Sequence, residues 1–263
     1  MDIASVLGTL LGLFALLGGQ LLEGGSLIQL VQLTSALIVV GGTAGATLVA
    51  FPINDLKQAF KSLPLIFKEV RFDTKQLIQD AVRISGVARK EGLLSIESHR
   101  ASIRDPLFRS SIKLVVDGFD PPAVREIIEA EMNHDFEETE TAARVFEGAG
   151  GYAPTIGILG AVLGLIHVMM MLNEPSKIGE GIAVAFVATI YGVGLSNLIL
   201  LPWGAKLKRK ASQKTMFQEI VKAGVLGIQE GLSPHFLERK LEALLSTSST
   251  KIQNGNQNEK KAS

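Results

Sequence analysis

The sequence predicts an all-α fold, that of a polytopic membrane protein with four transmembrane helices and a helical cytoplasmic domain. Hydrophobic residues make up 47% of the 263 residues, and the mean hydropathy is +0.30 although 20% of the residues are charged. Charge is absent from four long stretches and dense between them, as when membrane spans alternate with soluble segments. Because hydrocarbon offers the backbone no hydrogen-bond partners, helices are the structure expected for such spans.

Each uncharged stretch has close to the roughly 20 residues that a helix needs to cross a bilayer. The predicted spans are Ile3–Leu22, Leu33–Phe51, Pro154–Leu172 and Ile182–Trp203. No basic region precedes the first span and no small-residue cleavage site follows it. It is therefore expected to be a retained span and not a removed signal peptide.

Basic residues cluster after the second and fourth spans. The clusters are Lys57, Lys61, Lys68 and Arg71, then Lys206, Lys208, Arg209 and Lys210. The other two connections, Glu23–Gln32 and Asn173–Gly181, hold one basic residue, Lys177. By the positive-inside rule, both termini and the long segment between spans two and three are expected to lie in the cytoplasm.

The predicted organisation follows from these spans. Residues 1–51 hold transmembrane helices 1 and 2, residues 52–151 a cytoplasmic helical domain, residues 152–205 transmembrane helices 3 and 4, residues 206–245 a cytoplasmic helical tail, and residues 246–263 a disordered tail. In the domain, Lys75–Lys90 has the apolar spacing of a helix. A cap and two prolines at Asp120–Pro122 start another helix, which continues into span three. Its expected apolar face is Val124, Ile127, Ile128, Met132 and Phe136.

Several functions are excluded by what the sequence lacks. There is no Cys, so disulfides, zinc–thiolate sites and thiol catalysis are excluded. Walker, dinucleotide-binding and HExxH motifs are absent, so no enzyme activity, cofactor or metal is expected. The net charge is zero, so the overall charge indicates no particular partner, and no nucleic-acid partner is expected.

The spans are rich in small residues and contain no Asp, Glu, Lys or Arg. Small residues let helices approach closely, either within the chain or between copies around a pore. Thr189 lies mid-span, and its hydroxyl either bonds back to its own helix or lines an ion path. His167, the one candidate for titration, is more simply explained as a neutral hydrogen-bonded or interfacial side chain. An ion path therefore needs a carboxylate on another protein's helix, packed against the small-residue faces of spans three and four.

Six segments in order, followed by a proline, make the chain resemble the MotA/PomA family of flagellar stator proteins within the MotA/TolQ/ExbB superfamily. They are Leu22–Ser26, Leu37–Thr43, Arg89–Glu97, Val116–Pro121, Ala153–Ala161 and Ala188–Gly194, closing at Leu201–Pro202. The similarity extends from residue 1 to about residue 245 and is more specific than any single motif.

The resemblance implies a pentamer around a dimer of a MotB-like, single-span, peptidoglycan-binding protein whose membrane Asp binds the ion. Ion flow turns the ring against the rotor protein FliG. By matched position, Arg89 and Glu97 meet the rotor, Pro154 and Pro202 couple ion passage to movement, and Thr189 faces the ion path, which Thr155 can also line. On residues alone, the prolines can equally mark an ordinary helix start and stop.

The resemblance also predicts H⁺, not Na⁺, as the coupling ion. Sodium-type relatives carry Thr seven residues after the first proline, where this chain has Ala161, and a methyl group cannot replace an oxygen of the hydration shell. Two alternatives remain. ExbB/TolQ-type energisers of outer-membrane processes usually have three spans, with the large loop after the first. A membrane scaffold without ion flux explains the small residues but not Thr189.

Overall fold

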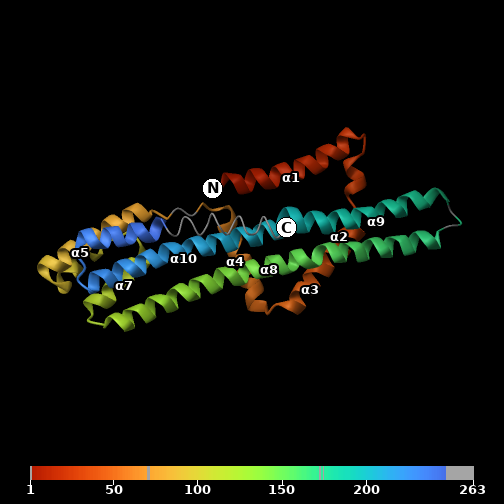
Figure 1. Ribbon diagram of the computed structural model, residues 1–263. Coiled ribbons are helices and arrows are strands. Elements are labelled where there is room, and N and C mark those ends of the chain that lie inside the picture. The colour runs from red at the N-terminus through yellow and green to blue at the C-terminus, as the bar shows by residue number, and fades with distance from the viewer. Residues whose placement is uncertain (1, 70–71, 172, 174, 247–263) are drawn as a thin grey trace. The chain divides into compact units, whose positions relative to one another are not determined.

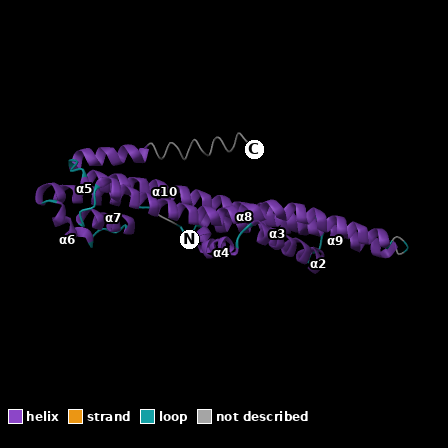
Figure 2. Ribbon diagram, turned by 90° about the horizontal axis from the view of Figure 1, so that it is seen from below, coloured by secondary structure: helices purple, strands orange, loops and turns teal. Residues whose placement is uncertain are grey.

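In a computed structural model, residues 2–69, 72–171, 173 and 175–246 are described. This part of the chain contains helices and turns and no strand, as Figure 2 shows. Four of its helical stretches are long and apolar enough to cross a membrane: Ile3–Leu22, Leu27–Ala50, Pro121–Met170 and Gly181–Gln229. The predicted all-α membrane fold is confirmed. Residues 247–263, predicted to be disordered, and Leu172 at the end of span three lie outside the described residues.

The helices follow one another with short connections (Figure 1). The first membrane pair and its exit are α1 Ile3–Leu22, the 3₁₀ turn η1 Leu27–Leu30, α2 Leu33–Ala36, the π-helical turn η2 Leu37–Gly41, α3 Gly42–Ala50 and α4 Ile53–Phe67. Next come α5 Thr74–Glu91, η3 Leu93–Ile96, α6 Glu97–Arg100 and α7 Pro106–Val116. The long elements are α8 Pro121–Met170, α9 Pro175–Leu195, the π-helical turn η4 Ser196–Leu200 and α10 Leu201–Gln229, followed by a helix over residues 234–246.

The chain forms two compact units. The first, here called the span unit, is Met1–Val70 with Glu137–Lys210, and the second, the polar unit, is Arg71–Phe136 with Ala211–Ser263. Both α8 and α10 contribute to each. The predicted segments 52–151 and 206–245 were divided at the expected membrane boundaries, whereas the two units are divided by contacts between residues. For this reason α4, which was predicted to belong to the cytoplasmic domain, falls in the span unit.

The polar unit has its own apolar core. Leu77, Ile84, Phe108, Val124 and Leu237 are among its buried members, contributed by α5, α7, the start of α8 and the helix over 234–246. Side-chain caps start three helices: Asp73 accepts from Gln76 N at 3.0 Å, Asp105 from Phe108 N at 2.8 Å and Asp120 from Ala123 N at 3.1 Å. These caps satisfy N–H groups that a helix start leaves unpaired.

The span unit has a smaller core, formed where α4 packs on α8 and α10. Its buried members include Leu56, Ile66, Ala143, Phe146 and Leu207. Trp203 meets the rings of Phe67 and Phe146 edge-on, with centroids 5.9 and 5.7 Å away. Such edge-to-face contacts add stability to that gained from burying the rings. This cluster holds the end of span four that was predicted to face the cytoplasm against α4.

Candidate functional site

Glycines bring α8 and α9 into contact, and the two helices run side by side in Figures 1 and 2. A Cβ added to Gly157 would lie 3.0 Å from the Cα of Gly192, and one added to Gly192 would lie 2.5 Å from the carbonyl oxygen of Ala153. Likewise, a Cβ added to Gly160 would lie 2.9 Å from the Cβ of Ala188. These small residues serve packing within the chain.

This contact corrects one expectation. The small-residue faces of spans three and four were predicted to receive a partner's helix, but the faces at Gly157, Gly160 and Gly192 are filled by each other. Gly41 and Gly194 are different, because a Cβ there would meet nothing within 4 Å. The faces at Gly157, Gly160 and Gly192 are therefore not open to a further helix.

Thr189 and Ala161, two of the predicted pathway residues, lie at the same level of this hairpin, since their neighbours Ala188 and Gly160 touch. Both are half-buried. The Thr189 hydroxyl makes no hydrogen bond to any residue that the structure describes, so the bond back to its own helix is not formed. The third residue, Thr155, is exposed and donates to Tyr152 O at 2.8 Å. Of the Thr155 and Thr189 hydroxyls, only that of Thr189 has no hydrogen bond within the described part of the chain, so only it is available to bind another group.

Pro154 lies in the interior of α8, where it creates an unpaired acceptor. A proline has no N–H, so it cannot donate to the carbonyl four residues earlier in a helix, here Gly150 O. The buried hydroxyl of Ser196 donates to that oxygen at 2.7 Å. The gap in the hydrogen bonding of α8 is thus closed from span four.

Pro202 lies in the first turn of α10, directly after the π-helical turn η4, and is exposed. The N–H of Leu201 donates to Ser196 O, five residues back. The backbone stays helical from α9 through η4 into α10. Pro154 therefore does not start a helix, and Pro202 does not end one.

Charged residues hold the N-terminal end of α1 to the exit of span four. Asp2 caps α1 at Ser5 N and pairs with Lys206 at 2.5 Å, and the hydrogen bond from Lys206 lowers the pKa of Asp2. The ammonium of Lys210 donates to carbonyls at the end of α4, including Lys68 O at 2.7 Å. Burial lowers the pKa of Lys210. Two lysines of the basic cluster after span four therefore also act as structural clamps.

Comparison with known proteins assigns the family. The description of the MotA/TolQ/ExbB proton channel family matches residues 99–219, and that of the motility protein A N-terminal region matches residues 6–91. Motility protein A of Helicobacter pylori is 33% identical over 241 residues, which are 92% of this chain and 94% of the relative. The chain belongs to the MotA/TolQ/ExbB proton channel family.

Other members of the family extend the likeness. Chemotaxis protein PomA of Vibrio alginolyticus is 32% identical, over 94% of this chain and 96% of the relative. The structure of C. jejuni MotAB has a TM-score of 0.86 at 30% identity, covering 93% of this chain and 96% of that one. The structure of the flagellar MotAB stator complex from Bacillus subtilis has a TM-score of 0.85 at 32% identity, and the match covers 94% of this chain and 98% of that one. The resemblance to stator proteins is confirmed, and this family is one of channels and not of enzymes.

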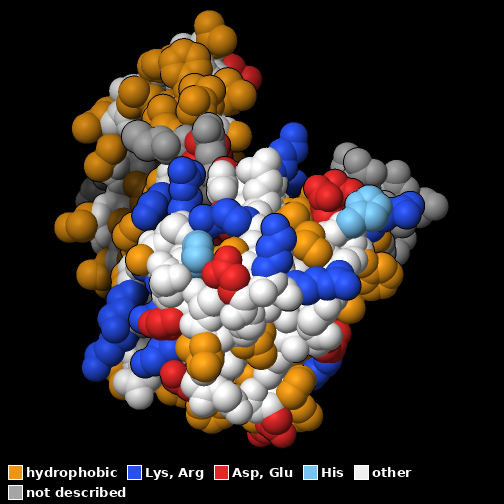
Figure 3. Space-filling model, turned by 90° about the vertical axis from the view of Figure 1, so that its left-hand side faces the viewer, with side chains coloured by type: hydrophobic (Ala, Val, Ile, Leu, Met, Phe, Trp, Pro, Cys, Tyr) orange, Lys and Arg blue, Asp and Glu red, His pale blue; other side chains and the backbone are white. Residues whose placement is uncertain are grey.

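Arg89 and Glu97, which the family resemblance places at the rotor, lie on different helices. Arg89 is exposed near the end of α5, and Glu97 is exposed at the start of α6, where it pairs with Arg100 at 3.0 Å. Gly92 between them has a φ of +87°, a conformation that favours glycine. Figure 3, which views the left-hand side of Figure 1, shows basic and acidic side chains scattered among uncharged ones on that face.

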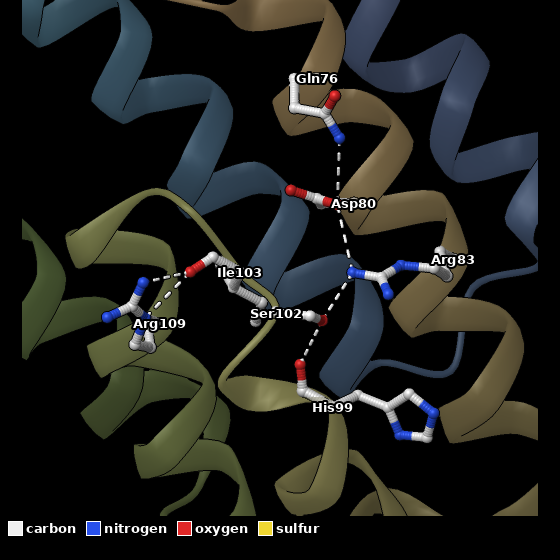
Figure 4. A network of polar contacts seen from close by, with 7 residues as sticks. All are labelled: Gln76, Asp80, Arg83, His99, Ser102, Ile103 and Arg109. Atoms are coloured by element: carbon white, nitrogen blue, oxygen red, sulfur yellow. Dashed lines mark hydrogen bonds and ion pairs between the residues drawn. The ribbon is translucent and has the colours of Figure 1, made fainter.

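A polar network fixes the segment that carries Glu97 (Figure 4). On α5, the buried Asp80 accepts from Arg83 at 3.2 Å, and Arg83 also donates to Ser102 Oγ at 2.9 Å. Ser102 donates to His99 O at 2.6 Å. The next turn is held by Arg109, which donates to Ile103 O from Nε at 2.9 Å. This network ties the residues after Glu97 to α5 and α7.

Two hydroxyls of span four were not singled out from the sequence. Ser196 is described above, and Tyr191 donates to Leu30 O at 2.5 Å and accepts from Gln32 N at 3.3 Å, holding the start of span two. Ser196 could have been found by asking which donor meets the carbonyl four residues before Pro154. Among the described residues, no group of His, Asp or Glu is arranged to hold a metal ion.

Proposed function

We propose that this chain is the ion-channel subunit of a flagellar motor stator, which couples inward proton flow to torque on the rotor. The observation that carries the proposal is the match to the MotAB structures over more than nine tenths of the chain. The sequence resemblance, by which Thr189 corresponds to the family's ion-path threonine and Pro154 and Pro202 to its coupling prolines, supports the proposal. No enzymatic activity is proposed.

The proposed partner is a MotB-like single-span protein that binds peptidoglycan. The two solved relatives are MotAB complexes, and this chain has no Asp, Glu, Lys or Arg within its predicted spans. A proton cannot cross hydrocarbon without a protonatable site, and a hydroxyl does not titrate near neutral pH. The partner's membrane Asp supplies that site. Five copies of the chain around two partners, acting on FliG, complete the proposed assembly.

In the proposed orientation both termini and the polar unit lie in the cytoplasm. The basic residues after spans two and four support it. Protons pass beside the hydroxyl of Thr189, and each change in charge of the partner's Asp shifts the helices at Pro154 and Pro202. The polar unit, with Arg89 and Glu97 on its surface, transmits that shift to the rotor.

The test is partner dependence. The chain expressed alone should leave membrane potential and growth unchanged. Expressed with a MotB-like partner in a stator-less strain, it should restore swimming, and an Asp→Asn change in the partner's span should abolish swimming. A steady proton current from the purified, partner-free chain in liposomes, lost on His167→Ala, would overturn the proposal and make His167 the ion site.

An ExbB/TolQ-type role is less well supported. The four apolar helices place the long polar segment after the second span, and residues 6–91 match the motility protein A N-terminal region. A scaffold without ion flux would show no dependence of swimming on the partner's Asp, so the same experiment excludes or supports it.

A further inference from the structure

We propose that Ser196 is a positioning residue that joins the two proline turns, so that a movement at Pro154 is passed to Pro202. This inference rests on the proposed stator function, because it assigns a role within the same coupling step. The observation behind it is one hydrogen bond, from the Ser196 hydroxyl to Gly150 O at 2.7 Å.

The acceptor is unusual because Pro154 leaves it without a backbone donor. In an uninterrupted helix the N–H of residue 154 would bond to Gly150 O, but proline has none. An unpaired carbonyl buried away from water carries a desolvation penalty. Ser196 is 1% exposed and takes the place of the missing donor.

The same residue takes part in the turn before Pro202. The carbonyl of Ser196 accepts from the N–H of Leu201, which closes the π-helical turn η4. π-helical turns often occur at functional sites, and they relax helix geometry locally. The side chain of Ser196 thus binds the proline turn of α8, while its backbone belongs to the turn that precedes the proline of α10.

The backbone of α8 at Gly150 packs directly against the residues next to this bond. A Cβ added to Gly150 would lie 2.7 Å from Leu201 Cδ2 and 3.4 Å from Leu200 Cβ. The glycine backbone of α8 therefore lies directly against the residues between Ser196 and Pro202. If α8 bends at Pro154, Gly150 O moves, and the bond draws η4 with it.

A second buried serine supplies a matched control. Ser35 is 0% exposed and donates to Val184 O, again between two membrane helices, at 3.0 Å. Residue 188, four positions later, is Ala and has an N–H, so Val184 O has its own helical donor. Ser35→Ala removes a similar interhelical bond without exposing an acceptor that a proline left unpaired.

The first experiment separates torque from assembly. Stators carrying Ser196→Ala, Ser196→Thr or Ser35→Ala are restored one unit at a time to motors driving tethered beads, with the partner present. We expect Ser196→Ala to reduce the speed added by each unit at high load by about twofold or more, with the number of units unchanged. Ser196→Thr, which keeps the hydroxyl, should restore the step, and Ser35→Ala should match the wild type. Full-sized steps with fewer units in Ser196→Ala would show a merely structural role.

The second experiment needs no motor function. In the purified complex in detergent, Ser196→Ala should lower Tm by about 2 to 4 °C. In a Pro154→Ala background, residue 154 regains an N–H for Gly150 O, so Ser196→Ala should cost much less. Equal losses in both backgrounds would overturn the inference. Failure of the wild-type complex to restore motility at all would instead count against the stator function. The Tm comparison in the two backgrounds would still test the role of the Ser196–Gly150 hydrogen bond.

Discussion

The Cα atoms of Gly157 and Gly192 face each other so closely that a Cβ on Gly157 would lie 3.0 Å from the Cα of Gly192. The backbones of spans three and four therefore touch about one helical turn from the predicted pathway residues Thr189 and Ala161. Close approach of this kind depends on the absence of side chains. A side chain at either glycine of the α8–α9 seam would therefore clash with the backbone of the other helix.

The first prediction concerns this seam. Gly192→Ala should destabilise the complex by about 1 to 3 kcal/mol, because the new methyl group would overlap the Ala153 carbonyl oxygen. Gly194→Ala is the control, since a Cβ there meets nothing within 4 Å and alanine favours helix. Thermal unfolding of the purified complex in detergent measures both. Equal Tm values for the two variants would contradict the packing described here.

The second prediction concerns Arg89 and Glu97 at the rotor. Charge reversal at either residue should leave the membrane level intact and reduce swimming, and an opposite reversal on FliG should partly restore it, because electrostatic pairing tunes docking more than folding. The ion pair between Glu97 and Arg100 is exposed, so Arg100→Ala should cost under about 1 kcal/mol of stability. Full swimming of the double reversal Arg89→Glu with Glu97→Lys on an unmodified rotor would refute the assignment.

The third prediction is that the coupling ion is H⁺. Ala161 offers a methyl group where sodium-type relatives carry a hydroxyl, and a partly dehydrated Na⁺ needs oxygen ligands. Swimming speed at fixed pH should therefore not depend on external Na⁺, and a protonophore should stop it. A speed that collapses without Na⁺ and ignores the protonophore would show sodium coupling.

The spans could be predicted from the sequence, since charge and hydropathy alone mark Ile3–Leu22 to the residue. The continuous helix through Pro154 was also predicted and is present. Side-chain neighbours could not be predicted in the same way. Ile127, expected on the apolar face of α8, is 39% exposed, whereas Val124 and Ile128 are buried, because the core covers a narrower stripe of the helix than the apolar residues occupy. The Ser196–Gly150 bond depends on tertiary contact that no local pattern encodes.

The fourth prediction concerns pH and Asp105, the cap of α7. Burial raises the pKa of Asp105 although backbone N–H groups oppose it. The folded state therefore holds the proton more tightly, and this group's contribution to stability falls as pH rises from the unfolded pKa, about 3.9, through the folded pKa. Asp105→Asn keeps a capping oxygen without the charge, so its Tm relative to wild type should be higher at pH 7 than at pH 4. Asp105→Ala should show the same pH dependence relative to wild type, offset by about 1 kcal/mol for the lost cap, and a pH-independent difference for Asp105→Asn would contradict the shift.

The last prediction concerns Thr189, whose hydroxyl has no hydrogen-bond partner among the described residues. A hydroxyl at membrane depth normally bonds back to its own helix, as that of Thr47 does to Thr43 O at 2.7 Å. Because Thr189 forgoes that bond, its hydroxyl is available to a water, an ion or the partner's carboxyl group. Thr189→Ala should impair swimming severalfold while the complex still co-purifies with its partner, and Thr189→Ser should retain swimming. Thr47→Ala, the matched loss of a back-bonded hydroxyl, should have little effect, and His167→Ala should be milder than Thr189→Ala. Equal swimming of the Thr189→Ala and Thr47→Ala strains would mean that the Thr189 hydroxyl has no part in ion passage.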